Sequence, residues 1–247
     1  MPIRVERQRT SKSRLQMHWD FPVYVAPEEK ALEESDAETV AAWQRRALPR
    51  EQALAWIAGD DPRPLLVLRE CKWCNGTDWA LLSSSQDNEK TLLLAQWFHC
   101  VKLPNDVLEP DHPFTRLFPE GQPPHLFVCS RDGSNYVPLQ GDQSRTELWQ
   151  AMESVLKKEY RKNPSRAVQD YLKLLAEFDT IDSMIDWRQE QLDEVIERDG
   201  PDSRKARKIR KQLEELGRRR EKALAKEKEL RDLGLRRPLP KATAGAE

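Results

Sequence analysis

The stretch RPLLVLRECKWCNGTDWALL, residues 63–82, joins a short apolar run to two cysteines that are separated by two residues. The run at residues 65–68 is continuous rather than alternating, and this pattern is typical of a central strand with both faces buried. The residues after the cysteines, with Trp79, Leu81 and Leu82, have the character of a helix. Cys71 is therefore expected where a buried strand ends and a helix begins.

The cysteine pair has the spacing of a redox centre. An anionic sulfur at a helix N-terminus is stabilised by unpaired N–H groups and by the helix dipole, which lowers the thiol pKa toward roughly 7 or below. Cys74 lies one helical turn after Cys71 on the same side, so it can resolve a mixed disulfide formed at Cys71. Two other interpretations remain open, an inert remnant of the fold and half of a zinc site. Zinc needs about four ligands, and Cys100 and Cys129 occur singly in predicted strands, where burial is expected.

The remaining elements of an α/β domain over residues 49–160 follow from apolar runs and turn residues. The sequence predicts helices over residues 49–59 and 88–97 and after Ser144, and strands over residues 98–103, 125–129 and 136–140. Asp132 and Gly133 form a turn between the last two strands, so these strands are expected to form a hairpin. Asn88 is expected to cap the second helix, and Ser144 with Glu147 has the pattern of a capping box.

Residues 1–48 form an N-terminal extension. Apolar and polar residues alternate over residues 15–25, and this alternation predicts a strand that is half-buried on one face. Pro22 lacks a backbone N–H, which favours an edge position for this strand. An acidic segment over residues 27–42 follows, expected to be part helix and part linker.

The composition changes after Asn163. Over residues 161–235, apolar residues at three-four spacing lie on both sides of the turn DGPDS, residues 199–203. This pattern predicts two long helices that fold back on each other as an antiparallel coiled-coil hairpin. The alternative is one interrupted helix that pairs with another chain. Residues 236–247 are expected to be a disordered tail.

Charge and composition exclude several kinds of partner. Lys and Arg total 41 against 42 Asp and Glu, so the net charge of −1 gives no support for a nucleic-acid partner. No apolar run approaches the roughly 18 residues of a membrane span, and the N-terminus lacks the apolar region of a signal peptide. A cytoplasmic protein without a membrane partner is therefore expected. The sequence shows no phosphate-binding loop, Ser-His-Asp set or metal motif, so neither a metal nor a cofactor is expected.

The order of strand, CKWC, helix, a proline before the strand HLFVC, a hairpin and a closing helix resembles thioredoxin-like proteins. The similarity covers residues 49–156, and CKWC looks like the branch of the family in which an aromatic residue precedes the second cysteine. The resemblance implies a thioredoxin-like central sheet flanked by helices, with Cys71 as the nucleophile and Cys74 as the resolving thiol. It also implies that Pro124 is a cis-proline that faces the cysteines.

The resemblance assigns roles to other residues around the dithiol. Trp73, Gln122 and Pro123 are expected to contact the substrate, and Lys102 matches a lysine found near the active site of some family members. Glu70 stands directly before Cys71. It either acts as a base or, as a neighbouring anion, raises the pKa of Cys71.

The expected function is that of a thiol–disulfide oxidoreductase that acts on protein thiols and disulfides. The C-terminal hairpin would then dock a protein partner or pair two copies of the chain. The alternative is a redox-inactive scaffold protein, in which the thioredoxin-like domain is a binding module and the hairpin provides reach.

Overall fold

The computed structural model describes residues 7–25, 46–71, 80–82 and 88–237. The chain divides into two compact units. One combines residues 1–16 with 162–234, and the other combines residues 17–161 with 235–247.

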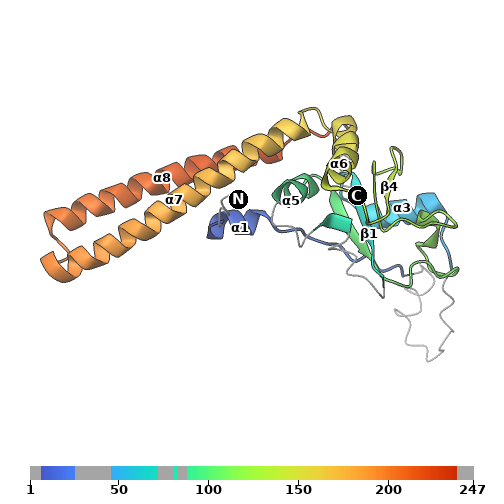
Figure 1. The fold of residues 1–247 in the computed structure, drawn as a ribbon, viewed down its shortest axis with the longest axis horizontal. Coiled ribbons are helices and arrows are strands. Elements are labelled where there is room, and N and C mark those ends of the chain that lie inside the picture. Colours follow the sequence, from blue (N-terminus) through green and yellow to red (C-terminus); the bar gives the residue numbers. More distant parts are fainter. Residues whose placement is uncertain (1–6, 26–45, 72–79, 83–87, 238–247) are drawn as a thin grey trace, which may run out of the picture. The chain divides into compact units, whose positions relative to one another are not determined.

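The second unit contains a four-stranded mixed sheet with the strand order β2-β1-β3-β4 (Figure 1). β1 (Leu65–Arg69) pairs in parallel with β2 (His99–Leu103) and antiparallel with β3 (Leu126–Cys129). β3 pairs antiparallel with β4 (Val137–Leu139), so the predicted hairpin is confirmed. The predicted central position of β1 is confirmed as well, because it has a neighbour on each side and its four apolar residues are completely buried.

Helices pack on the sheet. Alternate β1 residues, Leu65 and Val67, join a core cluster with α3 (Arg50–Ala58) and with Leu117 of the short 3₁₀ helix η1 (Thr115–Leu117). α6 (Arg145–Glu159) packs on β3 and against α5 (Glu89–Ala95). The mixed α/β architecture predicted for this part of the chain is therefore confirmed.

The two predicted helix caps have different outcomes. The capping box is confirmed, because the Ser144 hydroxyl accepts from Glu147 N (3.2 Å) and the Glu147 carboxylate accepts from Ser144 N (2.7 Å). Asn88 does stand directly before α5, but its side chain does not cap that helix. Its Nδ2 donates instead to Leu81 O at 2.8 Å, because a buried amide donor needs a partner and this buried carbonyl lies within reach.

The strand predicted over residues 15–25 is wrong. Only Asp20 pairs with the sheet, through an isolated parallel bridge to β2. The expected alternation of burial breaks down beyond it, because Phe21 and Val23 are 62% and 75% exposed. Pro22, between them, has no N–H with which to continue the ladder. The acidic segment predicted over residues 27–42 lies outside the described residues.

The first unit is built on two long antiparallel helices, as predicted. α7 (Pro164–Asp199) begins with Pro164 in its first turn, and the Asn163 side chain accepts from Ser165 N. α8 (Arg204–Arg231) follows after a short turn and packs along α7. A short helix that the sequence did not predict, α1 (Arg9–Arg14), packs against α7 (Figure 1). No helix among the described residues is both long and apolar enough to cross a membrane.

The disordered tail predicted over residues 236–247 was placed too early in the sequence, because Arg236 and Arg237 are held in the structure. Arg236 N donates to Glu159 O at 2.8 Å, and the guanidinium of Arg237 pairs with the Glu159 carboxylate at 3.0 Å. Glu159 is buried, so its charge needs these partners together with the Ser130 hydroxyl, which donates at 2.6 Å. Residues 238–247 lie outside the described part of the chain.

Candidate functional site

Cys71 lies two residues beyond the end of β1. Glu70 N donates to Leu103 O at 3.0 Å, so the backbone pairing of β1 with β2 continues up to the residue before the cysteine. Cys71 is half-buried and is disulfide-bonded. Cys74, Trp73 and most of the helix predicted after them lie outside the described residues, although Ala80 and Leu81 are helical.

The two other cysteines of the described chain have a different character. Cys100 and Cys129 are buried free thiols within strands, which confirms the burial expected for them. Burial raises the pKa of each thiol to about 12, although Arg63 and Arg50 act in the opposite direction on Cys100 and Cys129 respectively. Neither sulfur is therefore a nucleophile at neutral pH.

Glu70 and Lys102, both predicted to modulate the cysteines, are brought together. Lys102 is paired with Leu68 in the β1–β2 register, and Glu70 lies two residues further along the same face. Their charged groups are 2.6 Å apart, and the Lys102 ammonium also lies 6.0 Å from the centre of the exposed Phe21 ring. The negative charge next to Cys71 is thus balanced by a lysine.

The loop before β3 is held by Arg69, the last residue of β1. Its guanidinium donates to the carbonyls of Pro124 (3.2 Å) and Pro123 (3.4 Å), and its backbone N–H donates to His125 O (2.8 Å). Pro124 is buried, Pro123 is half-buried and Gln122 is exposed. Burial and the charge of Arg69 lower the pKa of His125, so this imidazole is neutral at pH 7.

The cis geometry that the resemblance implied for Pro124 is wrong. No peptide bond among the described residues is cis, so the bond before Pro124 is trans. With this geometry the two proline carbonyls both accept hydrogen bonds from Arg69. The loop remains beside the cysteine, because Arg69 pairs with His125 in continuation of the β1–β3 ladder.

Two residues beside the Glu70–Lys102 pair and the proline loop were not predicted from the sequence. Arg69 carried a signal, because a charged residue ends the apolar run and stands two positions before the cysteine, on the same face of an extended chain. Phe21 carried none. Its place beside Lys102 depends on the bridge that Asp20 forms with β2, which joins segments about 80 residues apart.

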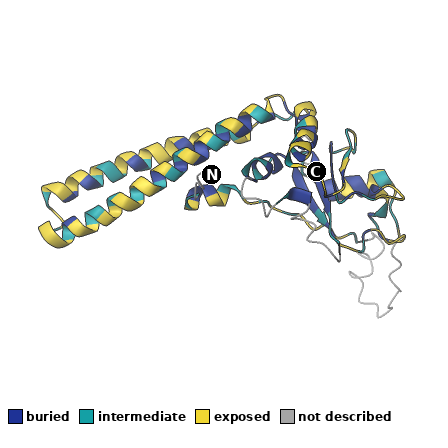
Figure 2. Ribbon diagram, in the orientation of Figure 1, coloured by how far each residue is buried: buried dark blue, intermediate teal, exposed yellow. Residues whose placement is uncertain are grey.

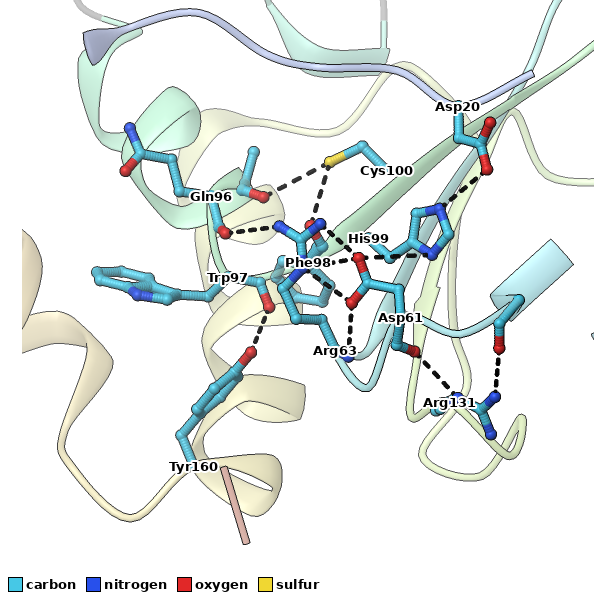
Figure 3. A network of polar contacts seen from close by, with 12 residues as sticks. Asp20, Asp61, Arg63, Gln96, Trp97, Phe98, His99, Cys100, Arg131 and Tyr160 are labelled. Atoms are coloured by element: carbon cyan, nitrogen blue, oxygen red, sulfur yellow. Dashed lines mark hydrogen bonds and ion pairs between the residues drawn. The ribbon is translucent and has the colours of Figure 1, made fainter. Parts of the chain in front are cut away.

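A second polar cluster lies at the opposite end of β1, about 26 Å of extended chain from Cys71. Its centre is Arg63, which holds the Asp61 carboxylate at 2.6 Å and donates to Gln96 O at 3.0 Å (Figure 3). His99 Nε2 lies 3.3 Å from Asp20, and its other ring nitrogen lies 3.9 Å from Asp61. The cluster joins the loop before β1 to the start of β2.

The electrostatics of this second cluster indicate a structural role. Burial alone would raise the pKa of Asp61, but the hydrogen bonds and charge of Arg63 outweigh it and the pKa is lowered. The Tyr160 hydroxyl donates to Trp97 O at 2.8 Å, and burial raises its pKa. The Asp61 carboxylate is therefore engaged by Arg63, and the Tyr160 hydroxyl by a backbone carbonyl. Across the described ranges, no group of three or more His, Cys, Asp or Glu residues could hold a metal ion.

Comparison of the chain with protein-family models, with curated proteins and with solved structures gave no significant match. The residues and geometry of the chain itself therefore carry the functional proposal.

Proposed function

We propose that the protein is a thiol–disulfide oxidoreductase that works through Cys71 and Cys74. The observation that carries the proposal is the contrast among the described cysteines. Cys71 is half-buried, disulfide-bonded and placed just beyond a central strand, whereas Cys100 and Cys129 are buried thiols with raised pKa values. A redox cysteine needs access to a partner and a sulfur that ionises, and only Cys71 of these three has that access.

The order of the described elements supports a thioredoxin-like fold for this unit. β1 leads to the cysteines, β2 lies parallel to it, and the loop with Pro124 leads into the β3–β4 hairpin and then α6. This is the order that the resemblance implied, although the trans bond before Pro124 departs from it. The coiled-coil character of the α7–α8 pair belongs to the same proposal, supported by its buried residues at three-four spacing.

The chemistry is a two-step exchange. The Cys71 thiolate attacks one sulfur of a protein disulfide, so a Cys71–substrate bond forms and the substrate's second sulfur leaves as a thiolate. The Cys74 thiolate then attacks the sulfur of Cys71 and releases the first substrate sulfur. Two electrons pass to the substrate and a Cys71–Cys74 disulfide remains. An external dithiol reductant restores the reduced form, and the same steps in reverse oxidise a substrate dithiol.

A redox titration tests the proposal. The purified protein is equilibrated in glutathione buffers of defined redox potential. The fraction of Cys71 and Cys74 in the reduced form is then measured by alkylation and mass spectrometry. We expect a two-electron couple at roughly −200 to −300 mV, the range of cytosolic dithiols. A protein that shows no such couple and turns over no protein disulfide would instead be a binding module.

The binding module is the second candidate function, and one observation favours it. Prolines have no N–H, and the carbonyls of Pro123 and Pro124 already accept from Arg69. The loop beside Cys71 therefore offers little backbone for a substrate peptide to pair with. A folded protein with an inert dithiol that still retains a specific protein ligand would support this candidate.

The Glu70–Lys102 pair predicts how the reactivity of Cys71 responds to charge. Replacing Glu70 with glutamine removes an anion next to the sulfur, so the thiolate forms more readily. Replacing Lys102 with methionine leaves that anion unbalanced and has the opposite effect. In the reduced protein at pH 7, we expect iodoacetamide to alkylate Cys71 about threefold faster in Glu70→Gln and about threefold more slowly in Lys102→Met. Equal rates in all three proteins would show that the pair does not act on Cys71.

A further inference from the structure

Arg69, the last residue of β1, is a half-buried cation without a carboxylate partner. Figure 2 shows the strands of the sheet as buried, so this charge stands where the buried sheet ends. Burial lowers the pKa of the guanidinium, and no carboxylate in the part of the chain that the structure describes forms an ion pair with it. Because a charge that is partly removed from water is costly, an anion beside it would be stabilising.

The guanidinium of Arg69 is fixed in place by the proline loop. Its Nε donates to Pro124 O at 3.2 Å and its Nη2 lies 3.4 Å from Pro123 O. The remaining nitrogen, Nη1, donates to none of the described residues. The group is therefore held by two backbone carbonyls, while one of its nitrogens stays available to an anion.

The register of the sheet brings this guanidinium to the level of Cys71. The N–H of Arg69 donates to His125 O in continuation of the β1–β3 pairing. Two residues further along, the same register places Pro123 opposite Cys71. Along the chain, Arg69 and Cys71 are two residues apart, which in an extended segment is about 7 Å on the same face. Both relations place the positive charge beside the cysteine.

The other titratable groups next to Cys71 and on the proline loop supply no free positive charge. The Glu70 carboxylate pairs with Lys102 at 2.6 Å, so these two charges largely cancel. His125 is neutral at pH 7, because burial and the charge of Arg69 lower its pKa. Of these four residues, Arg69 alone carries an uncompensated charge.

We infer that the Arg69 guanidinium holds the sulfur of reduced Cys71 as a thiolate. In the disulfide the sulfur is neutral. A dithiol reductant supplies two electrons and two protons, of which one proton stays on Cys74 and the other passes to water. The Cys71 thiolate that remains is the anion that Arg69 lacks. This inference rests on the function proposed for the dithiol, and Arg69 acts on the exchange through Cys71.

The charge of Arg69 should make the protein a stronger oxidant. A positive charge about 7 Å from a sulfur at the edge of the protein changes the thiolate equilibrium about tenfold. The thiolate exists only in the reduced form, so at a pH above the titration midpoint the same factor favours the dithiol over the disulfide. For a two-electron couple, tenfold corresponds to about 30 mV.

The pH dependence of Cys71 alkylation tests the inference in the reduced, full-length protein. Iodoacetamide is uncharged, so its rate from about pH 5 to about pH 10 follows the thiolate fraction. Trypsin cleaves after Lys72 and so separates Cys71 from Cys74 for mass spectrometry. Arg69→Gln removes the charge but keeps an N–H donor for the carbonyls, and its midpoint should lie about one pH unit above that of the wild type. Arg69→Lys keeps the charge and should stay within about 0.3 pH units.

Arg131 provides the matched control. Its guanidinium also donates to two backbone carbonyls, Asp61 O at 3.0 Å and Gly59 O at 2.6 Å, but at the opposite end of the sheet. Arg131→Gln should therefore leave the midpoint of Cys71 at the wild-type value. Equilibration of Arg69→Gln in glutathione buffers, at a pH above both midpoints, should give a potential about 30 mV more negative than that of the wild type.

Two results would overturn the inference. One is an unchanged midpoint in folded Arg69→Gln, and the other is an equal shift in Arg69→Gln and Arg69→Lys, which would limit Arg69 to fixing the proline loop. Arg69→Met, a second neutral variant that fills the same space with an apolar chain, should shift the midpoint as Arg69→Gln does. Failure of the proposed function is a separate result, because it appears in the wild-type protein as the absence of a two-electron couple.

Discussion

Replacing Cys71 with serine is expected to reduce the rate of protein-disulfide exchange at least about a thousandfold, because the attacking sulfur is lost and a serine hydroxyl stays protonated at neutral pH. The change replaces one small half-buried side chain with another at the end of a strand, so the circular dichroism spectrum should be unchanged. The measurement is turnover of a protein disulfide with an excess of a dithiol reductant.

Three further variants sharpen this prediction. Cys74→Ser should accumulate a covalent complex with the substrate, since the Cys71 mixed disulfide forms but is not resolved. Cys100→Ala and Cys129→Ala should keep most of the activity, because these buried sulfurs take no part in the exchange. Retention of more than about a tenth of the wild-type rate in Cys71→Ser would assign the nucleophile to another group.

Replacing Phe127 with alanine should lower the free energy of unfolding of the sheet unit by about 4 kcal/mol. Phe127 is fully buried in β3, with its ring 5.7 Å from that of Phe118 and 5.0 Å from that of Tyr136, so its removal leaves a cavity in the core. The measurement is urea unfolding followed by tryptophan fluorescence.

Phe21→Ala is the matched control, because the same side chain is removed from a position that is 62% exposed. Its cost should stay below about 0.5 kcal/mol. A loss of less than about 1.5 kcal/mol in Phe127→Ala would contradict the packing of β3 against α3 and the loop before it.

The periodic parts of the chain could be predicted from local sequence. The run at residues 65–68 indicated a buried strand because no polar residue interrupts it, and the three-four spacing after Pro164 indicated long paired helices. The Ser144–Glu147 capping box formed as predicted, since both of its hydrogen bonds join residues three apart. In each case the residues that decide the structure are neighbours along the chain.

Errors arose where a distant partner decided the outcome. Residues 15–25 alternate like a strand, but only Asp20 reaches β2, and the position of Pro22 prevents further pairing. Asn88 has the residue type of a helix cap, yet the carbonyl of Leu81 competes for its side chain. Arg236 and Arg237 looked like part of a polar tail, but a buried carboxylate at Glu159 holds Arg237 in place.

The sequence by itself determined the four strands of the sheet, the long helices and the placement of Cys71 just beyond a central strand, because hydrophobic periodicity and capping act over a few residues. Only the tertiary structure decided which side chains surround that cysteine. Lys102 balances Glu70 and Arg69 holds the proline loop because strands from separate parts of the chain lie side by side at hydrogen-bonding distance. Such pairings depend on the register of the whole sheet, and no local pattern encodes it.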